Sequence, residues 1–109
     1  MRSAQQVAAI GLDGVVVSNH GGRQFDGAPA ALDVLPGIKQ AVGDELTVVF
    51  DSGVRTGLDI IRALALGADF VMLGRPFMYG VSALGEAGGG PVVEILRDDL
   101  RHKLVQLGC

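Results

Sequence analysis

Residues 14–24 read GVVVSNHGGRQ, a short β-branched run followed directly by polar residues and glycines. Two further apolar runs are TVVF at 47–50 and FVML at 70–73, and each also stops at a polar residue or a glycine. Continuous apolar runs of this length are typical of strands that are buried on both faces of a parallel sheet. The sequence therefore predicts three strands, at 14–17, 47–50 and 70–73.

Caps, prolines and glycines mark the segments around these strands as helices. The expected helices run from Ser3 to Ile10, from Pro36 to Val42, between a cap at Thr56 and a stop at Gly67, and from Pro91 to Leu107. A helix between consecutive strands makes those strands adjacent and parallel, with a right-handed crossover. Repeated βα units indicate a (β/α) barrel, of which three units are only a piece, or a doubly wound sheet. The glycine-rich segment 80–90 is the expected flexible part.

Composition excludes several functional classes. The chain has 109 residues, of which 49% are hydrophobic and 19% charged, as in one folded domain rather than a disordered chain. Its net charge of −3 provides no positive electrostatic field for binding the nucleic-acid backbone. The single cysteine, Cys109, excludes a disulfide framework and a cysteine-built metal site. With neither a signal peptide nor a transmembrane segment in the sequence, we expect a cytoplasmic protein.

The first polar segment combines a histidine with an arginine. His20 and Arg23 follow the strand at 14–17 and are separated by two glycines. Histidine can take a proton near neutral pH, and arginine can hold a carboxylate through two hydrogen bonds. Because ligands of parallel α/β folds bind beyond the carboxyl ends of the strands, this segment predicts a base beside an anion clamp. The alternative is a glycine-rich turn with a solvated arginine.

The next two strand ends predict a phosphate site. The second strand is followed by DSGVR at 51–55 and the third by GRP at 74–76. Glycine-rich turns before helix N-termini expose backbone N–H groups to phosphate, and an arginine on each loop adds positive charge. The alternative is ordinary turn chemistry, in which Asp51 accepts hydrogen bonds from loop amides. Met72 and Met78 are interpreted as core residues.

These motifs together resemble one enzyme family. The strings SNHGGRQ at 18–24, DSGVR at 51–55, ALALGAD at 63–69 and GRP at 74–76 resemble the FMN-dependent α-hydroxy acid dehydrogenases and oxidases. The resemblance covers essentially the whole chain, and the first string is the most specific. It implies a TIM barrel, with residues 1–109 as its last three βα units, the C-terminal part of the hydroxy acid dehydrogenase domain.

The resemblance also implies a cofactor, a substrate and a role for each site residue. The reaction is oxidation of an L-2-hydroxy acid to a 2-oxo acid, with FMN accepting two electrons as hydride or through a carbanion. His20 is then the base, Arg23 binds the substrate carboxylate and Ser18 contacts the flavin. The ribityl chain and phosphate of FMN are assigned to Asp51, Ser52, Gly53, Val54, Arg55, Gly74 and Arg75.

Other residues that the family uses lie on earlier strands and are not in this sequence. They are a flavin-contacting lysine, substrate-binding tyrosines and a carboxylate that orients the histidine. We therefore expect the 109-residue chain alone to be inactive, and to form a homo-oligomer or to need the N-terminal half of the barrel. Lactate and mandelate dehydrogenase types would add peripheral membrane association to the cytoplasmic location.

Two alternative functions remain at this point. One is a non-enzymatic half-barrel that binds FMN or phosphate, or pairs with another chain. The other is a different FMN- or phosphate-binding barrel enzyme. The pairing of His20 with Arg23 disfavours this second alternative, because it supplies both the base and the carboxylate clamp that a 2-hydroxy carboxylate needs.

Overall fold

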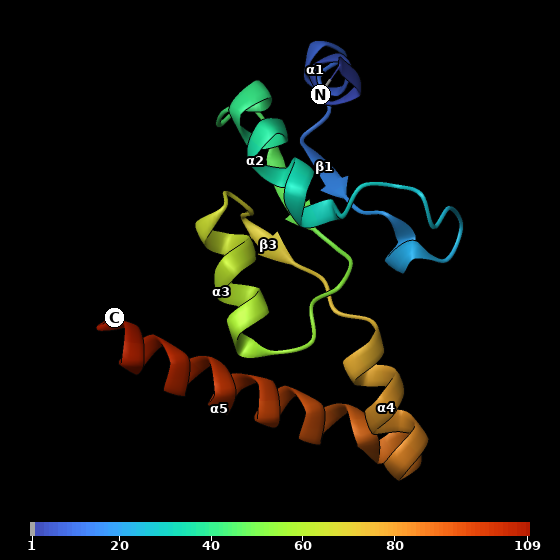
Figure 1. Cartoon of the computed structure of the whole chain (residues 1–109), viewed down its shortest axis with the longest axis vertical. Helices are drawn as coiled ribbons and strands as arrows, with labels where there is room; N and C mark the ends of the chain where they lie inside the picture. The colour runs from blue at the N-terminus through green and yellow to red at the C-terminus, as the bar shows by residue number, and fades with distance from the viewer. Residues whose placement is uncertain (1) are drawn as a thin grey trace.

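The structure, a computed structural model, describes residues 2–109 and is built around one small parallel sheet (Figure 1). Strands β1 (Gly14–Val17), β2 (Thr47–Phe50) and β3 (Phe70–Val71) pair in the order β1-β2-β3. Both pairings are parallel, and Val49 of β2 lies opposite Val16 of β1 and Phe70 of β3. This arrangement confirms the prediction of adjacent parallel strands joined by helical crossovers.

The chain also forms five α-helices. They are α1 (Arg2–Ala9), α2 (Ala31–Val42), α3 (Gly57–Ala65), α4 (Arg75–Leu84) and α5 (Gly89–Leu107), with short 3-10 turns η1 (His20–Gly22) and η2 (Gly85–Gly88). Figure 1 shows α1 and α2 at one end of the molecule and the long α5 across the other, with α3 between the sheet and α5. In this view the carboxyl ends of the strands point toward α4.

Helices cover only one face of the sheet. On that face Val17, Val48 and Phe50 are almost completely buried and pack with residues of α2 and α3 such as Leu35 and Ala63. In parallel strands successive side chains point to opposite faces, so the partners Val16, Val49 and Phe70 share the other face. There Val16 is 55% exposed and Phe70 65% exposed. The prediction of burial on both faces is therefore wrong for β1 and β3 within this chain.

Helix α3 begins at a capping box, as the T-x-x-D pattern predicts. The Thr56 hydroxyl accepts the Asp59 N–H, and the Asp59 carboxylate accepts the Thr56 N–H at 3.0 Å. The same end of α3 is pressed against α5, where a Cβ at Gly57 would lie 2.5 Å from the Leu100 backbone nitrogen. A glycine is therefore required where α3 and α5 meet.

Three other predicted boundaries differ from the structure. Helix α2 begins at Ala31, so Pro36 lies inside the helix instead of opening it. Helix α4 was not predicted, and segment 80–90, expected to be flexible, belongs to α4, η2 and the start of α5. Strand β3 ends at Val71 instead of residue 73, because its partner β2 ends at Phe50 and offers no further ladder positions.

Candidate functional site

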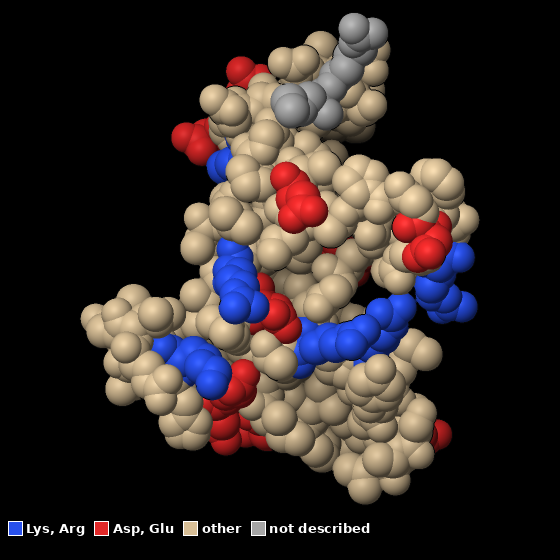
Figure 2. Space-filling view, viewed as in Figure 1, with Lys and Arg blue, Asp and Glu red and all other residues tan. Residues whose placement is uncertain are grey.

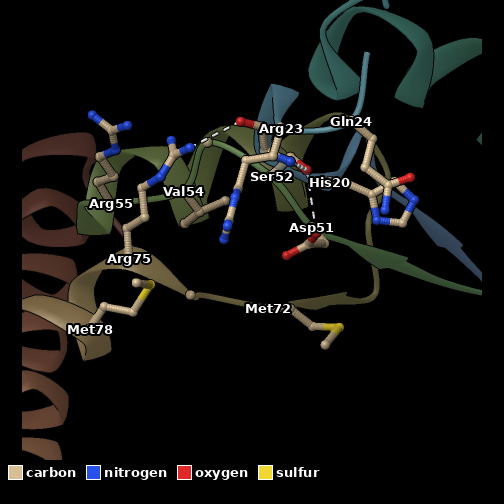
Figure 3. Close-up of a pocket in the computed structure, with 13 residues that line it drawn as sticks. His20, Arg23, Gln24, Asp51, Ser52, Val54, Arg55, Met72, Arg75 and Met78 are labelled. Carbon is tan, nitrogen blue, oxygen red and sulfur yellow. Dashed lines mark hydrogen bonds between the residues drawn. The ribbon is translucent and has the colours of Figure 1, made fainter. Parts of the chain in front are cut away.

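The three loops that follow the strands meet around one cavity of about 820 Å³. All the predicted site residues except Ser18 line it. The lining residues are His20, Gly21, Arg23, Gln24, Asp51, Ser52, Gly53, Val54, Arg55, Met72, Gly74, Arg75 and Met78. In the view of Figure 3, His20 and Gln24 lie at one end, Arg55 and Arg75 at the other, and Arg23 between them. Residues far apart in sequence therefore share one site because parallel strands end at the same edge of the sheet.

The turn that carries His20 has an unusual backbone. His20, Gly21 and Gly22 have φ values of 56°, 66° and 73°, so three successive residues are in the left-handed region. Glycine adopts this region without a penalty, whereas histidine does not. Strained non-glycine residues of this kind cluster at functional sites. The turn leaves His20 exposed at the cavity, and no hydrogen bond reaches its imidazole from the part of the chain that the structure describes.

Two serine hydroxyls and one carboxylate support this turn from below. Ser18 Oγ donates to Asp51 Oδ2 at 2.6 Å and accepts the His20 N–H at 3.0 Å. Ser52 Oγ donates to the same carboxylate oxygen at 3.3 Å. It also accepts the N–H groups of Asn19 and Gly21, at 3.2 and 3.1 Å. Ser18 is half-buried and is not among the residues that line the cavity, and its hydroxyl helps to bond the turn to the loop after β2.

Arg75 ties the third loop to the same turn. Its Nη2 donates to the Gly21 carbonyl at 3.0 Å (Figure 3), and the side chain is half-buried. It is also the first residue of α4, so the positive end of that helix dipole points at the cavity. One carboxylate, that of Asp51, and three guanidinium groups, those of Arg23, Arg55 and Arg75, line this cavity. The cavity is therefore positive although the whole chain carries a net charge of −3.

The space-filling view agrees with this distribution of charge. Figure 2 shows Lys and Arg side chains across the hollowed middle of the molecule, between the end that carries α1 and the end that carries α5. An anionic group in the cavity, such as a phosphate or a carboxylate, would contact these cationic groups directly.

The N-terminus of α3 is already satisfied by other groups. The N–H of Arg55 donates to Asp59 Oδ2 at 3.2 Å, and the N–H of Gly57 donates to Asp99 Oδ2 at 2.7 Å. Partial burial raises the pKa of Asp59, but hydrogen bonds from the Thr56 hydroxyl and from backbone N–H groups outweigh it and hold that pKa below its ordinary value. The start of α3 therefore offers less to an anion than the sequence predicted, and α4 supplies the open helix N-terminus.

Sequence reasoning missed three side chains at the cavity. Met72 and Met78, interpreted as core residues, are 51% and 59% exposed and line the cavity instead. Gln24 lines it as well. The exposure of Met72 could have been predicted from the alternation of side chains along a strand. Val71 packs against the core, so the next side chain, that of Met72, points away from the core.

Residues 2–109 contain no group of three or more His, Cys, Asp or Glu side chains arranged to hold a metal ion. None of the helices in that range combines the length and apolar character needed to cross a bilayer.

Comparison with known proteins gives consistent sequence matches. The model of the family described as FMN-dependent dehydrogenase matches residues 1–109. The FMN-dependent alpha-hydroxy acid dehydrogenase of Penicillium citrinum is 56% identical over 97 residues, which make up 89% of this chain and 24% of that protein. L-lactate dehydrogenase of Azorhizobium caulinodans is 49% identical over 97% of this chain and 28% of that protein. 2-Hydroxyacid oxidase 1 of Mus musculus is 47% identical over 97% of this chain and 29% of that protein.

Solved structures agree with the sequence matches. The crystal structure of mandelate oxidase superimposes with a TM-score of 0.94 at 40% identity, covering 99% of this chain and 32% of that chain. The chain therefore spans less than a third of the length of these relatives. The family resemblance expected from the strand-end motifs is confirmed: the chain belongs to the FMN-dependent dehydrogenase family.

Proposed function

We propose that this chain supplies the base, the substrate clamp and the phosphate site of an enzyme that oxidises a 2-hydroxy acid to a 2-oxo acid with FMN. The observation that carries the proposal is that one cavity brings a histidine together with three arginines. A 2-hydroxy carboxylate and a flavin phosphate are both anions, and the reaction also needs a proton acceptor. The names of the relatives, among them an L-lactate dehydrogenase and a 2-hydroxyacid oxidase, support the same substrate class.

The described residues fit FMN at its phosphate end. Arg55 and Arg75 provide two guanidinium groups, and Gly74 and Arg75 stand at the open N-terminus of α4. Around Gly53 and Gly74 no atom lies within 4 Å of where a Cβ would be, so a ligand can approach the backbone closely at both places. We assign the phosphate and ribityl chain to these residues with Asp51, Ser52 and Val54. When bound, FMN would accept the two electrons removed from the substrate.

The substrate end of the cavity suits a carboxylate beside a base. Arg23 is exposed to the cavity and can hold a carboxylate through two parallel hydrogen bonds. His20 is also exposed there, and its imidazole can accept the proton that the 2-hydroxy acid loses. In this arrangement Arg23 fixes the substrate so that its reacting carbon is presented to the cofactor. Ser18 acts through the turn that carries His20, because its hydroxyl is bonded to Asp51 and to the His20 N–H.

We also propose that residues 1–109 are the last three βα units, and the C-terminal part, of a (β/α)8 barrel domain. The parallel order β1-β2-β3 with helices on one face is what a sector of such a barrel has. The uncovered face, with Val16 and Phe70, would then line the interior of the barrel. The remaining strands would supply further contacts to flavin and substrate, so we expect the 109-residue chain to be inactive by itself.

FMN titration tests the phosphate site directly. FMN is titrated into the FMN-free protein, either wild type or Arg75→Ala, and the fluorescence of the flavin is followed. Loss of one charged contact to the phosphate should weaken binding by about 10- to 100-fold. The matched control is Arg101→Ala, an exposed arginine of α5 away from the cavity, which should leave the affinity unchanged. Equal FMN affinity of Arg75→Ala and wild type would contradict the assignment of the phosphate to this cavity.

A further inference from the structure

Ser52 has a backbone conformation that glycine would adopt more readily. Its φ is 96°, well inside the region that side chains avoid, and the following Gly53 has a φ of 81°. A serine at this position therefore strains the backbone, and its side chain must contribute something that glycine could not.

The Ser52 hydroxyl contacts the turn that carries His20 on both sides of the histidine. It accepts the Asn19 N–H at 3.2 Å and the Gly21 N–H at 3.1 Å; Figure 3 shows Ser52 below the turn that carries His20. Its own proton can be donated to Asp51 Oδ2, at 3.3 Å, or to Ser18 Oγ, at 3.2 Å. Either donation leaves the lone pairs of the hydroxyl for the two amides. The residues before and after His20 are thus fixed to the loop after β2 through one oxygen atom.

We propose that Ser52 is a positioning residue that holds the His20 turn in its left-handed conformation and so orients the imidazole toward the substrate. This proposal rests on the proposed role of His20 as the base. In residues 2–109 no hydrogen bond reaches the imidazole, and His20 is hydrogen-bonded through its backbone alone, so the turn determines where the side chain starts. Arg75 supports the same turn through the Gly21 carbonyl, at 3.0 Å, but holds only the residue after the histidine.

Two substitutions distinguish the effect of the Ser52 hydroxyl from the effect of the strained Ser52 backbone. Ser52→Ala removes the hydroxyl and keeps the unfavourable φ, whereas Ser52→Gly removes the hydroxyl and relieves the strain. Ser52→Gly is therefore expected to fold even if Ser52→Ala is destabilised. The matched control is Ser82→Ala, an exposed serine of α4, which should behave like wild type.

The first measurement is amide hydrogen exchange in the FMN-bound protein, followed by NMR. The amides of Asn19 and Gly21 should lose protection in both Ser52 variants and keep it in Ser82→Ala. The His20 amide, bonded to Ser18 Oγ, serves as an internal reference for the rest of the turn. Unchanged protection of Asn19 and Gly21 in Ser52→Gly would overturn the proposal whatever the protein's activity.

The second measurement is steady-state oxidation of a 2-hydroxy acid by the same FMN-bound variants. At saturating FMN, misplacement of the base should lower kcat by about 10- to 100-fold in both variants, while KM for the 2-hydroxy acid stays within about twofold. Wild-type kcat in Ser52→Gly at saturating FMN would overturn the positioning role. If wild type itself oxidises no 2-hydroxy acid, the proposed function fails, and the exchange data still decide whether Ser52 holds the turn.

Discussion

Strained backbone is concentrated at two residues of the site. His20 and Ser52 are the non-glycine residues with positive φ in the described chain, at 56° and 96°, and such conformations cost on the order of 1–3 kcal/mol each. The two strained residues are joined through the Ser52 hydroxyl and the amides on either side of His20. The hydrogen bonds thus act where the strain occurs, on a turn whose histidine is exposed.

Arg23 and His20 should fail in different ways when they are changed in the complete FMN-bound protein. Lysine cannot make the two parallel contacts of a guanidinium, so Arg23→Lys should raise KM for the 2-hydroxy acid by about 10-fold or more. His20→Gln removes the proton acceptor, so it should lower kcat by about 100-fold or more. Steady-state kinetics with one substrate measure both effects. Small and equal effects of the two changes on KM and kcat would contradict these roles.

The site residues could be predicted from the sequence better than the contacts between them. His20, Arg55 and Arg75 each follow an apolar run, and parallel strands bring the ends of such runs together. The support of the turn by Ser52 could not be predicted, because it depends on a positive φ that a serine rarely has. Asp51 was assigned to the cofactor, and its hydrogen bond to Ser18 depends on how the loops after β1 and β2 meet in the fold.

The helices differ in how far the sequence determines them. Helix α3 was predicted because Thr56 and Asp59 form a local capping signal, which acts within one turn. Helix α4 was missed because Gly80 interrupts its sequence, yet this glycine allows close packing against Gly88 and Val92. Helix α2 continues through Pro36, with Leu35 fully buried beside it, so tertiary packing outweighs the lost backbone hydrogen bond. Local signals were thus sufficient only where no distant contact competed.

The cap of α3 should make stability depend on pH in a defined direction. The pKa of Asp59 is lower in the folded protein than its ordinary value of 3.8, so the folded state favours the charged carboxylate. Its stabilisation is therefore complete above about pH 4 and is lost as the pH falls through the folded pKa. Asp59→Ala should lower the free energy of unfolding by about 1 kcal/mol at pH 7, as is typical of a helix cap.

Urea unfolding at several pH values measures this effect as a difference between wild type and Asp59→Ala. The difference should begin to shrink below about pH 4, where the unfolded state takes up the proton first, and the charge contribution should be gone below the folded pKa, where the carboxylate is protonated in both states. Asp26→Asn is a suitable control, since Asp26 is an exposed loop residue whose carboxylate makes no hydrogen bond or ion pair within residues 2–109. A difference that stays constant from pH 7 to pH 3 would show that the Asp59 charge does not matter to the cap.

On the scale of the whole molecule, the chain is more open than a compact domain of its length. Its radius of gyration is 15.3 Å, whereas a compact chain of 109 residues is expected near 13 Å. The sheet has two edge strands, β1 and β3, and its uncovered face carries Val16, Val49 and Phe70. Exposed edges and apolar faces of this kind are surfaces on which other protein segments pack. In the barrel proposed above, the remaining strands would cover both.

The 109-residue chain by itself should therefore associate through the uncovered sheet face. Sedimentation velocity over a range of concentrations should show oligomers, and Phe70→Ser should shift them toward monomer, because Phe70 is an aromatic side chain of the apolar face and is 65% exposed on β3. Ile95→Ser is the matched control, since Ile95 is 67% exposed but lies on α5, away from the sheet. Dissociation by Ile95→Ser and not by Phe70→Ser would place the contact on α5 instead. A chain that stays monomeric at every concentration would show that the exposed face is too small to drive association alone, since burying one aromatic side chain gains only about 1.5–3 kcal/mol.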